Sequence, residues 1–402
     1  MTDEAKTLIE QIEVLAPQIA ARSMEIATLR NVPGDIVAAL RAAGLYRMFT
    51  PKHYGGMELD LPTALDVFRR LARIDSAVGW TAMIGAGASI ATPLLPRPVV
   101  DEIYRAPDVV MAGSTQPTTK AERVPRGWRV GGRWPFASGC RHADWIAGFC
   151  FMEENGRPIS DPHATDGRPL VMGFVLPATA WEIEDTWHAA GLEGTGSHHV
   201  VLKERVVSGA NFFDLVHGTS CETGPLFHAP WHMMVLMPPT VAIGIAEGAL
   251  DALVRLAKTG RKQVRAATAM QDSEVFRSGL GQAAAEIRTA RLALEVQVKL
   301  HWEQACAGTL RNEARFVEGH QVGVQAAAAC RRATEACFKL AGGSAAYLDS
   351  PVQRRFRDMM VLGQHMVVQE RQFANFGAAL LAEDGAKAQA VTQDPKVARL
   401  RA

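Results

Sequence analysis

Apolar residues recur at helical spacing over about the first hundred residues of the chain. The first segment places them at Ile9, Ile12, Leu15 and Ile19, and two further helical segments follow, IVAALRAAGLYRMF and LPTALDVFRRLARID. The stretches NVPGD and PKHYGG separate these segments, because proline and glycine interrupt helices. The pattern predicts a helical domain over residues 1–106.

The pattern changes over residues 107–222 to short runs of β-branched and aromatic residues between Gly, Pro and Asp. The strand candidates are VVMAGS, GWRVGGRWPF, WIAGFCFM, LVMGFVLP, WEIEDTW and HHVVLKERVV. No long helical pattern fits this region, so the sequence predicts an antiparallel β domain here.

Long helical patterns return after Pro239 and predict helices over residues 240–260, 273–308, 316–341 and 351–384. The start of the last helix is well marked, because Ser350 can cap it, Pro351 suits the first position and Gln353 completes a capping box. The preceding helix is expected to stop at the glycine pair 342–343. The order predicts an α+β protein whose C-terminal helical bundle covers residues 223–402.

Composition narrows the partners and the compartment. The 402 residues include 43 Lys+Arg and 42 Asp+Glu, a net charge of +1 that offers no field for nucleic acid or an acidic membrane. The 6 cysteines show no CxxC spacing, which indicates reduced thiols. The charged, amphipathic start is neither a signal nor a transit peptide. We therefore expect a cytoplasmic protein with a small-molecule substrate and no nucleic-acid or membrane partner.

Two uncharged runs, residues 77–96 and 223–246, approach the ~20 residues that span a bilayer. The first is rich in Gly, Ser and Thr and ends near two prolines, whereas the second contains histidines and a Pro-Pro break. Both compositions favour buried elements of a soluble protein.

Three motif matches carry little chemistry. GLGQAA at 279–284 fits a loose dinucleotide pattern, but no strand precedes it. His228 and His232 have the spacing of a helical metal pair, yet Pro230 lies between them and no HExxH motif is present, so we predict no metal. A Gly-x-Ser-x-Gly elbow is also missing, which disfavours a hydrolase.

The stretch GGRWPFASGCRHADW is more informative. Trp134 and Phe136 lie on a strand that runs into Ser138 and Gly139, so an aromatic strand ends in a hydroxyl and a flexible backbone. Such a place suits a flat ring whose nitrogen bonds to the hydroxyl, although a β-hairpin with a polar turn fits equally well. Trp187, before the Gly/Thr/Ser loop of DTWHAAGLEGTGSHHVV, and Trp80, at the start of a small-residue helix, supply further large rings.

The stretch RRFRDMMVLGQHMVV, residues 354–368, sets one histidine among apolar residues. On a continuous helix Arg354 and Asp358 form an i,i+4 ion pair, and Asp358, Leu362 and His365 share one face. A lone histidine on such a face is usually a core residue, so the pattern leaves a core role and a functional role for His365 both open.

Taken together, these pieces resemble the acyl-CoA dehydrogenase fold superfamily. The resemblance rests on the order of the domains, on YGG at 54–56, and on RWPFASG, GLEGTGS and GGSAAYLDSPVQRRFRD. The WPFASGCRHADW and DTWHAAGLEGTGS forms resemble its flavin-dependent monooxygenase branch, the oxygenase components of two-component hydroxylases. This implies a helical N-terminal domain, a middle antiparallel β-barrel or sandwich, and a C-terminal four-helix bundle.

The resemblance also implies cofactors and partners. The protein is expected to be a homotetramer that uses O2 and reduced FMN or FAD from a separate flavin reductase. The absence of a βαβ nucleotide-binding pattern supports a separate reductase. The expected substrate is a small aromatic, polycyclic or heteroatom compound. Ala88 stands near the second histidine of some phenol hydroxylases of the branch, which favours a different or larger substrate.

Site residues follow from the same resemblance. His365 stands where the branch has a histidine that handles a proton of the substrate, an imidazole being able to titrate near the working pH. Ser138 would contact flavin N5, and Ser114 would line the same face. The residues expected to wall the ring are Trp80, Trp134, Phe136 and Trp187. Arg357 is a candidate flavin contact, although the arginines of 354–357 look more like structural or intersubunit contacts than a phosphate clamp.

Two alternatives stay open. Dehydrogenases of the superfamily use a glutamate base, but the matching positions hold His365 and Met366, or His232 to Met234, with no glutamate. An acyl-CoA dehydrogenase or oxidase would therefore need an unusual base such as Glu247 or Glu370, and an acyl-CoA would then bleach its flavin. A catalytically inactive relative would bind flavin without forming a product.

Overall fold

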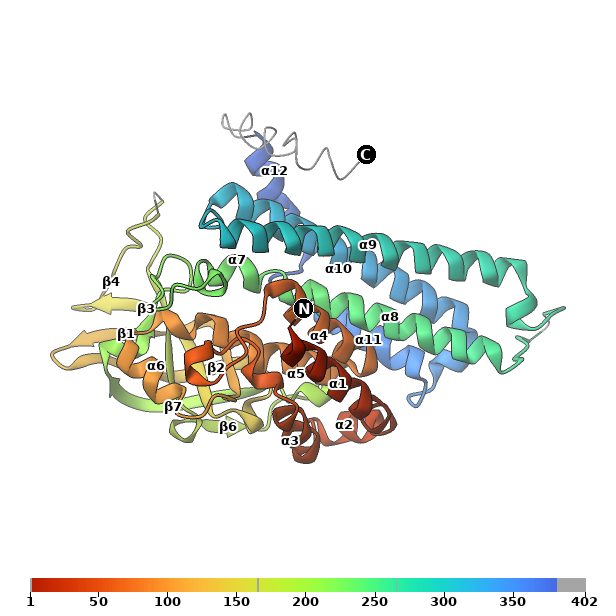
Figure 1. Cartoon of the computed structure of the whole chain (residues 1–402), viewed down its shortest axis with the longest axis horizontal. Coiled ribbons are helices and arrows are strands. Elements are labelled where there is room, and N and C mark those ends of the chain that lie inside the picture. The colour runs from red at the N-terminus through yellow and green to blue at the C-terminus, as the bar shows by residue number, and fades with distance from the viewer. Residues whose placement is uncertain (1, 165, 265, 382–402) are drawn as a thin grey trace.

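The computed structural model describes residues 2–164, 166–264 and 266–381, and its helices and strands follow the predicted order (Figure 1). Side-chain caps fix the starts of the N-terminal helices: Asp60 accepts from Thr63 N–H, and Asp75 accepts from the amides of residues 77 and 78. These helices are α1 (Asp3–Ala21), α2 (Ser23–Leu29), α3 (Gly34–Ala42), α4 (Leu61–Ile74), α5 (Ser76–Gly87) and α6 (Arg97–Ile103).

The middle region forms one sheet with the strand order β6-β7-β2-β1-β3-β5-β8, and β4 pairs with β3. Its strands are β1 (Met111–Val124), β2 (Gly127–Ala137), β3 (Trp145–Glu154), β4 (Arg157–Pro158), β5 (Val171–Pro177), β6 (Glu182–Glu184), β7 (His198–Val207) and β8 (Phe212–Phe213). The prediction of an antiparallel sheet is wrong for one pair, because β1 and β3 run parallel, with Met111 opposite Trp145. After its hairpin with β1, β2 leads into residues 138–144, which carry the chain to the other edge of β1.

The C-terminal region is helical, as predicted, and Figure 1 shows its long members running side by side. Its helices are α7 (Pro230–Met234), α8 (Met237–Lys258), α9 (Glu274–Cys306), α10 (Glu313–Ala341), α11 (Pro351–Leu362) and α12 (Phe373–Leu381). Ser350 caps α11 and α10 ends at Ala341 before Gly342, both as expected. The predicted domain boundaries fall between elements and stay predictions.

The predicted helix over 351–384 is wrong in one respect. The chain leaves α11 at Gly363, and a separate helix, α12, begins at Phe373; residues 382–384 lie outside the described part of the chain. Glycine is a poor helix former, and the Gln369 side chain donates to the Gln364 carbonyl in the turn that follows. His365 therefore lies in this turn rather than on a helix face.

Helix α8 is the centre of the packing, because it contacts α4, α5, α9, α10 and α11. Close approach requires small residues here: a Cβ at Gly244 would lie 2.3 Å from the Arg69 carbonyl oxygen of α4. Two segments are long and apolar enough to cross a membrane, Ser76–Leu94 and Pro230–Lys258, but they are 83% and 89% buried inside the protein. Both are core elements, as their composition predicts.

Candidate active site

Three elements distant in sequence meet at Trp80 on α5. Its indole N–H donates to Ser138 Oγ at 3.0 Å, just beyond the end of β2. Its ring meets the His365 ring edge-on, with centroids 5.2 Å apart and planes at 73°. The structure thus brings together three of the predicted site residues, one each from the helical, sheet and bundle regions.

A chain of buried hydroxyls continues from Ser138. Ser138 Oγ lies 2.6 Å from Ser197 Oγ, which lies 2.7 Å from Thr195 Oγ1. Thr195 Oγ1 donates to the Leu192 carbonyl at 2.8 Å, and the Trp187 indole donates to the same oxygen at 3.0 Å. All three hydroxyl residues are buried, so each hydroxyl needs protein partners to offset its lost hydration.

Two neighbouring residues of α11, Arg357 and Asp358, bind the loop that carries Trp187, Thr195 and Ser197. Asp358 Oδ1 accepts the Leu192 N–H at 2.7 Å, and Arg357 donates to the Ala190 carbonyl at 2.9 Å and pairs with Glu193. The contact is close, because a Cβ at Gly191 would lie 2.3 Å from the Arg357 carbonyl oxygen. Arg357 therefore has structural partners in the loop.

The arginines of α11 also anchor the junction of α4 and α5. Arg355 is buried and donates to the last carbonyls of α4, those of Ala72, Arg73 and Ile74, which satisfies acceptors that a helix end leaves free. Arg354 lies 4.0 Å from Asp75. The predicted Arg354–Asp358 ion pair is wrong, because these side chains turn to different partners, but the structural role expected of the cluster fits these contacts.

Burial shifts the pKa values of these groups. Desolvation raises the pKa of Asp358, although the Leu192 N–H opposes the shift, and desolvation lowers the pKa of Arg355. Desolvation also lowers the pKa of His365 to about 4. The pKa of His365 therefore lies below the working pH, where the sequence had led us to expect titration. The neutral form of the imidazole is favoured at that pH.

The tautomer of His365 follows from its neighbour. The Val367 N–H donates to His365 Nδ1 at 3.4 Å, so the ring hydrogen of the neutral imidazole lies on Nε2. Around it, Val367, Val368 and Leu362 are buried apolar residues. The side chain is thus partly buried and neutral, and in this tautomer it can donate through Nε2. Taking up a proton would place a positive charge in desolvated surroundings.

Trp134 and Phe136, the two residues of β2 that were expected to wall the ring, lie apart. Trp134 is fully buried, donates to the Phe149 carbonyl at 2.7 Å and packs on Phe174 and Trp181, so it does not reach a ligand surface. Phe136 is 58% exposed and its ring lies 6.3 Å from that of Trp187. Strand alternation puts both on one face, but an irregularity between Trp134 and Ala137 and the positive φ of Phe136 (63°) turn Phe136 outward.

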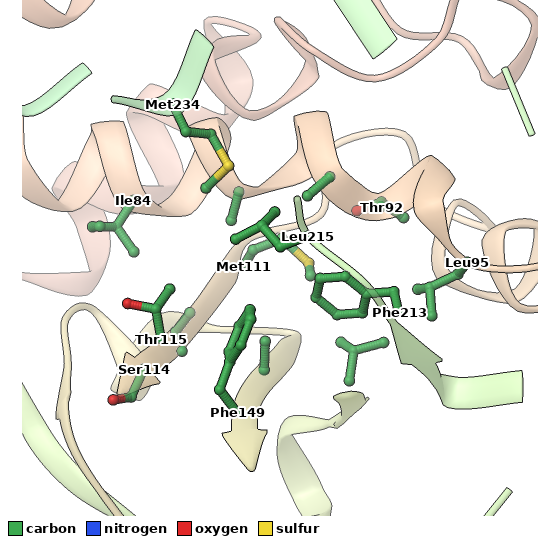
Figure 2. A pocket seen from close by; sticks show the side chains of 16 residues that line it. Ile84, Thr92, Leu95, Met111, Ser114, Thr115, Phe149, Phe213, Leu215 and Met234 are labelled. Carbon is green, nitrogen blue, oxygen red and sulfur yellow. The ribbon is translucent and has the colours of Figure 1, made fainter. Parts of the chain in front are cut away.

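A cavity is lined by Ile84, which follows Trp80 by about one helical turn on α5, and Figure 2 shows the side chains around it. It contains ≈ 650 Å³ of empty space, part of it open to solvent, and lies between the end of α5, the following turn and strands β1, β3 and β5. Ile84 and Ala88 continue the Trp80 face of α5 into it. Ser114 and Thr115 line it beside Phe149 (Figure 2). None of its described lining residues is charged.

Sequence reasoning anticipated two lining residues, Ser114 and Ala88, and missed the rest of the cavity. The signal was present in the apolar run 77–96, whose Ile84, Thr92 and Leu95 line it. The hydroxyl chain was also missed, although Thr195 and Ser197 stand in the motif GLEGTGS. Their distance from Ser138 in the sequence concealed that the hydroxyls meet.

The glutamates of the dehydrogenase alternative have other partners. Glu247 is buried between Arg69, at 2.5 Å, and Arg291, at 3.1 Å, while Glu370 pairs with Arg331. Neither lines the cavity. The His232 Nε2–H donates to the Asn312 carbonyl at 3.2 Å, because a carbonyl oxygen can only accept. Within the described ranges no cluster of three His, Cys, Asp or Glu could bind a metal.

The residues present fit a flavin ring. Phe136 and Trp187 offer an exposed aromatic edge, and the Ser138 hydroxyl beside them has one acceptor position beyond its two bonds to the protein. A flat heteroaromatic group with a ring nitrogen matches both features. The apolar cavity at the end of α5 offers space for a second molecule.

Comparison with known proteins agrees with this geometry. Residues 2–97 match the acyl-CoA dehydrogenase N-terminal domain and residues 236–370 match the acyl-CoA dehydrogenase C-terminal domain. An indole-3-acetate monooxygenase of Pseudomonas putida is 31% identical over 365 residues, which cover 89% of each chain. The oxygenase subunit HsaA, a flavin-dependent monooxygenase of Mycobacterium tuberculosis, is 26% identical over 398 residues, 93% of this chain and 95% of that one.

Solved structures show the same relationship. The HsaA monooxygenase of M. tuberculosis superposes with a TM-score of 0.84 at 26% identity, over 93% of this chain and 96% of that one. XiaF of Streptomyces, in complex with FADH2 and glycerol, gives a TM-score of 0.84 at 25% identity, over 93% and 94%.

The chain belongs to the acyl-CoA dehydrogenase family. Within that family it is a flavin-dependent monooxygenase, an oxidoreductase that uses reduced flavin and oxygen, as the sequence predicted. The expected small-molecule substrate and separate flavin reductase agree with the description of its relatives as oxygenase subunits and components.

Proposed function

We propose that this monooxygenase oxygenates an uncharged aromatic or heteroaromatic compound in the cavity beyond Trp80. The observation that carries the proposal is the position of this cavity, one helical turn from the Trp80, Ser138 and His365 cluster, with no charged lining residue among those described. Burying an unpaired charge in such a space costs roughly several kcal/mol, unless the charged group changes its protonation state. A neutral ring is therefore favoured.

Flavin contacts are proposed at Ser138, Phe136 and Trp187, whereas Ser114 on β1 lines the cavity. The bound reduced flavin supplies the activated oxygen. This chain's residues orient the ring, through the Ser138 hydroxyl and the aromatic edge, and keep water out through the apolar residues around His365. Trp134 is left out of this contact set because it lies in the sheet core, and Arg357 acts through the loop that it holds.

His365 is proposed as the group that handles the substrate proton. Its neutral form offers an N–H at Nε2, and the same nitrogen can act as acceptor in the other tautomer. Ala88, just after the end of α5, lines the cavity and supplies no second imidazole there. A substrate that needs strong activation of a phenol hydroxyl is therefore less suited to this site than one with an electron-rich ring.

The relatives' names describe related substrates. They include indole-3-acetate and resorcinol among the curated proteins, and dibenzothiophene and indole among the solved structures. Of these, the uncharged compounds match the cavity of this chain, and indole-3-acetate brings a carboxylate that its lining does not neutralise.

The assembly is proposed to be a cytoplasmic homotetramer. Supporting this, the long helix α9 exposes Val275, Leu292 and Val296, which are 82%, 48% and 43% accessible. Exposed apolar side chains on a long helix are typical of surfaces that pack in an oligomer. Sedimentation equilibrium would give the tetramer mass; a monomer would contradict this part of the proposal.

Rapid mixing tests the reaction class. The reduced-flavin complex is mixed with oxygen with and without indole, dibenzothiophene or resorcinol, and separately the oxidised complex is mixed anaerobically with an acyl-CoA. We expect product with at least one neutral compound and no bleaching by the acyl-CoA. Bleaching would favour a dehydrogenase, and flavin binding without any product would favour an inactive relative.

A further inference from the structure

The hydroxyl chain from Trp80 to Leu192 has a direction that can be worked out by counting hydrogens. Each hydroxyl has one hydrogen to donate, an indole N–H can only donate, and a carbonyl oxygen can only accept. Trp80 stands at one end and the Leu192 carbonyl at the other. The three hydroxyls between them belong to Ser138, Ser197 and Thr195.

The carbonyl end sets the orientation of every hydroxyl. Thr195 spends its hydrogen on the Leu192 oxygen, so it must accept from Ser197. Ser197 has then spent its own hydrogen and must accept from Ser138. The Ser138 hydrogen consequently points at Ser197, while its oxygen accepts from Trp80. All bonds in the chain run from Trp80 toward Leu192.

Leu192 is held so that this orientation cannot easily reverse. Its backbone has a left-handed conformation, with φ 50°, and its N–H is bound to Asp358. Besides the Thr195 hydroxyl, its carbonyl accepts from the Trp187 indole and from the Thr195 N–H, both at 3.0 Å. Reversing the chain would cost this buried carbonyl its bond from the Thr195 hydroxyl and would turn the Ser138 hydrogen away from Ser197, to no other acceptor among the described residues. Both losses are costly in a buried site.

We propose that Thr195 and Ser197 are positioning residues that hold the Ser138 hydroxyl as an acceptor and so make the site select reduced over oxidised flavin. N5 of reduced flavin carries a hydrogen and can donate to Ser138 Oγ, whereas N5 of oxidised flavin can only accept. This inference rests on the proposed flavin contact at Ser138. Loss or mismatch of one such hydrogen bond corresponds to roughly a tenfold change in affinity.

Removing a middle hydroxyl should weaken the selection. In Ser197→Ala the Ser138 hydrogen loses its acceptor and is free to turn toward N5 of the oxidised flavin. In Thr195→Val the Ser197 hydroxyl can turn round and donate to Ser138, which again frees the Ser138 hydrogen. Thr195→Ser keeps the hydroxyl and should behave as the wild type. Thr334→Val on α10 removes another buried hydroxyl, bonded to the Cys330 carbonyl at 2.8 Å, and is the matched control.

The test measures the dissociation constants of FAD and FMN in both redox states, anaerobically, for each variant. We expect the ratio of oxidised to reduced dissociation constants to fall about tenfold in Ser197→Ala and Thr195→Val, and to stay unchanged in Thr195→Ser and Thr334→Val. For this two-electron couple, a tenfold fall lowers the midpoint potential of bound flavin by about 30 mV.

The outcomes separate this inference from the proposed function. An unchanged ratio in Ser197→Ala, in a protein that still binds flavin and forms product, overturns the positioning role and leaves the function intact. An equal loss of affinity for both redox states also overturns it, because that result indicates a merely structural role. A wild-type protein that binds neither redox state overturns both proposals.

Discussion

Two neighbouring regions of the site are built on opposite principles. On the Ser138 side, every hydroxyl from Trp80 to Leu192 has a defined donor and acceptor, and Asp358 holds the loop beneath it. In the cavity beyond Ile84, the 16 lining residues present mostly carbon, as Figure 2 shows. The first region constrains orientation, whereas the second constrains size and charge.

The difference teaches where each kind of substitution should act. Changes on the polar side should alter how a bound ring is oriented and how a proton is handled, because each group there has a specific partner. Changes in the cavity should alter which compound is accepted. His365 contacts Trp80 from the turn after α11, and α5 leads on from Trp80 to the cavity.

The largest effect is expected at that meeting point. In His365→Ala, oxygenation should fall by about 10²-fold or more, the usual scale for a lost proton-transfer group, while flavin binding persists. Single-turnover product formation and flavin titration measure the two quantities. The neighbouring exposed Gln364→Ala is the matched control, and turnover at the wild-type rate in His365→Ala would remove the histidine from the mechanism.

The second-largest effect is expected in the polar region, at Asp358. In Asp358→Ala the buried Leu192 N–H loses its acceptor, so the free energy of unfolding should fall by about 1–3 kcal/mol, and flavin affinity should fall with it. Asp358→Asn keeps an acceptor oxygen and should lose less. Urea denaturation followed by fluorescence gives the comparison; equal losses in the two variants would mean that the charge, not the N–H bond, is what matters.

The cavity side should respond to a charge of the right sign. Ala88→Lys places an ammonium group at the cavity, so the affinity for indole-3-acetate relative to indole should rise about tenfold, because a carboxylate gains a partner. Ala88→Leu adds similar apolar bulk without charge and should not shift the preference toward the acid. The relative dissociation constants check this, and a preference that Lys leaves unchanged would place the substrate elsewhere.

The smallest effect concerns pH. Burial lowers the pKa of His365 to about 4, so the rate of oxygenation should change by less than about twofold between pH 6 and 8 and fall below pH 5 as the ring protonates. The folded state favours neutral His365, so its contribution to stability is complete above about pH 6.5 and is lost as pH falls toward 4. A sigmoidal rate change centred near pH 7 that disappears in His365→Gln would contradict this.

Local signals predicted much of the fold. The cap at Ser350 and the stop at Gly342 were readable because each depends on a few adjacent residues. Strand direction was not, since β1 and β3 pair in parallel through a crossover that alternation cannot reveal. The helix was extended past Gly363 because apolar residues continue there at a similar spacing, although the chain turns.

The sequence indicates which residues belong to the site better than it indicates how they are arranged in space. The resemblance named Ser138, Trp80 and His365 as site residues, and the structure brings these three side chains together, while their roles stay predictions. Trp134 and Phe136 separate because an irregular strand and a positive φ override alternation, which no pattern of apolar residues records. The cavity and the hydroxyl chain depend on contacts between distant segments, so they required the structure.

The most direct test of the account is one single-turnover experiment under ¹⁸O₂ with matched compounds, indole and indole-3-acetate, added to the reduced-flavin complex. The account predicts one ¹⁸O atom in the indole product and at least about tenfold less product from the acid, because the cavity offers no partner for its carboxylate. Equal or preferential oxygenation of the acid would contradict the uncharged cavity, and products without ¹⁸O would contradict the monooxygenase reaction itself.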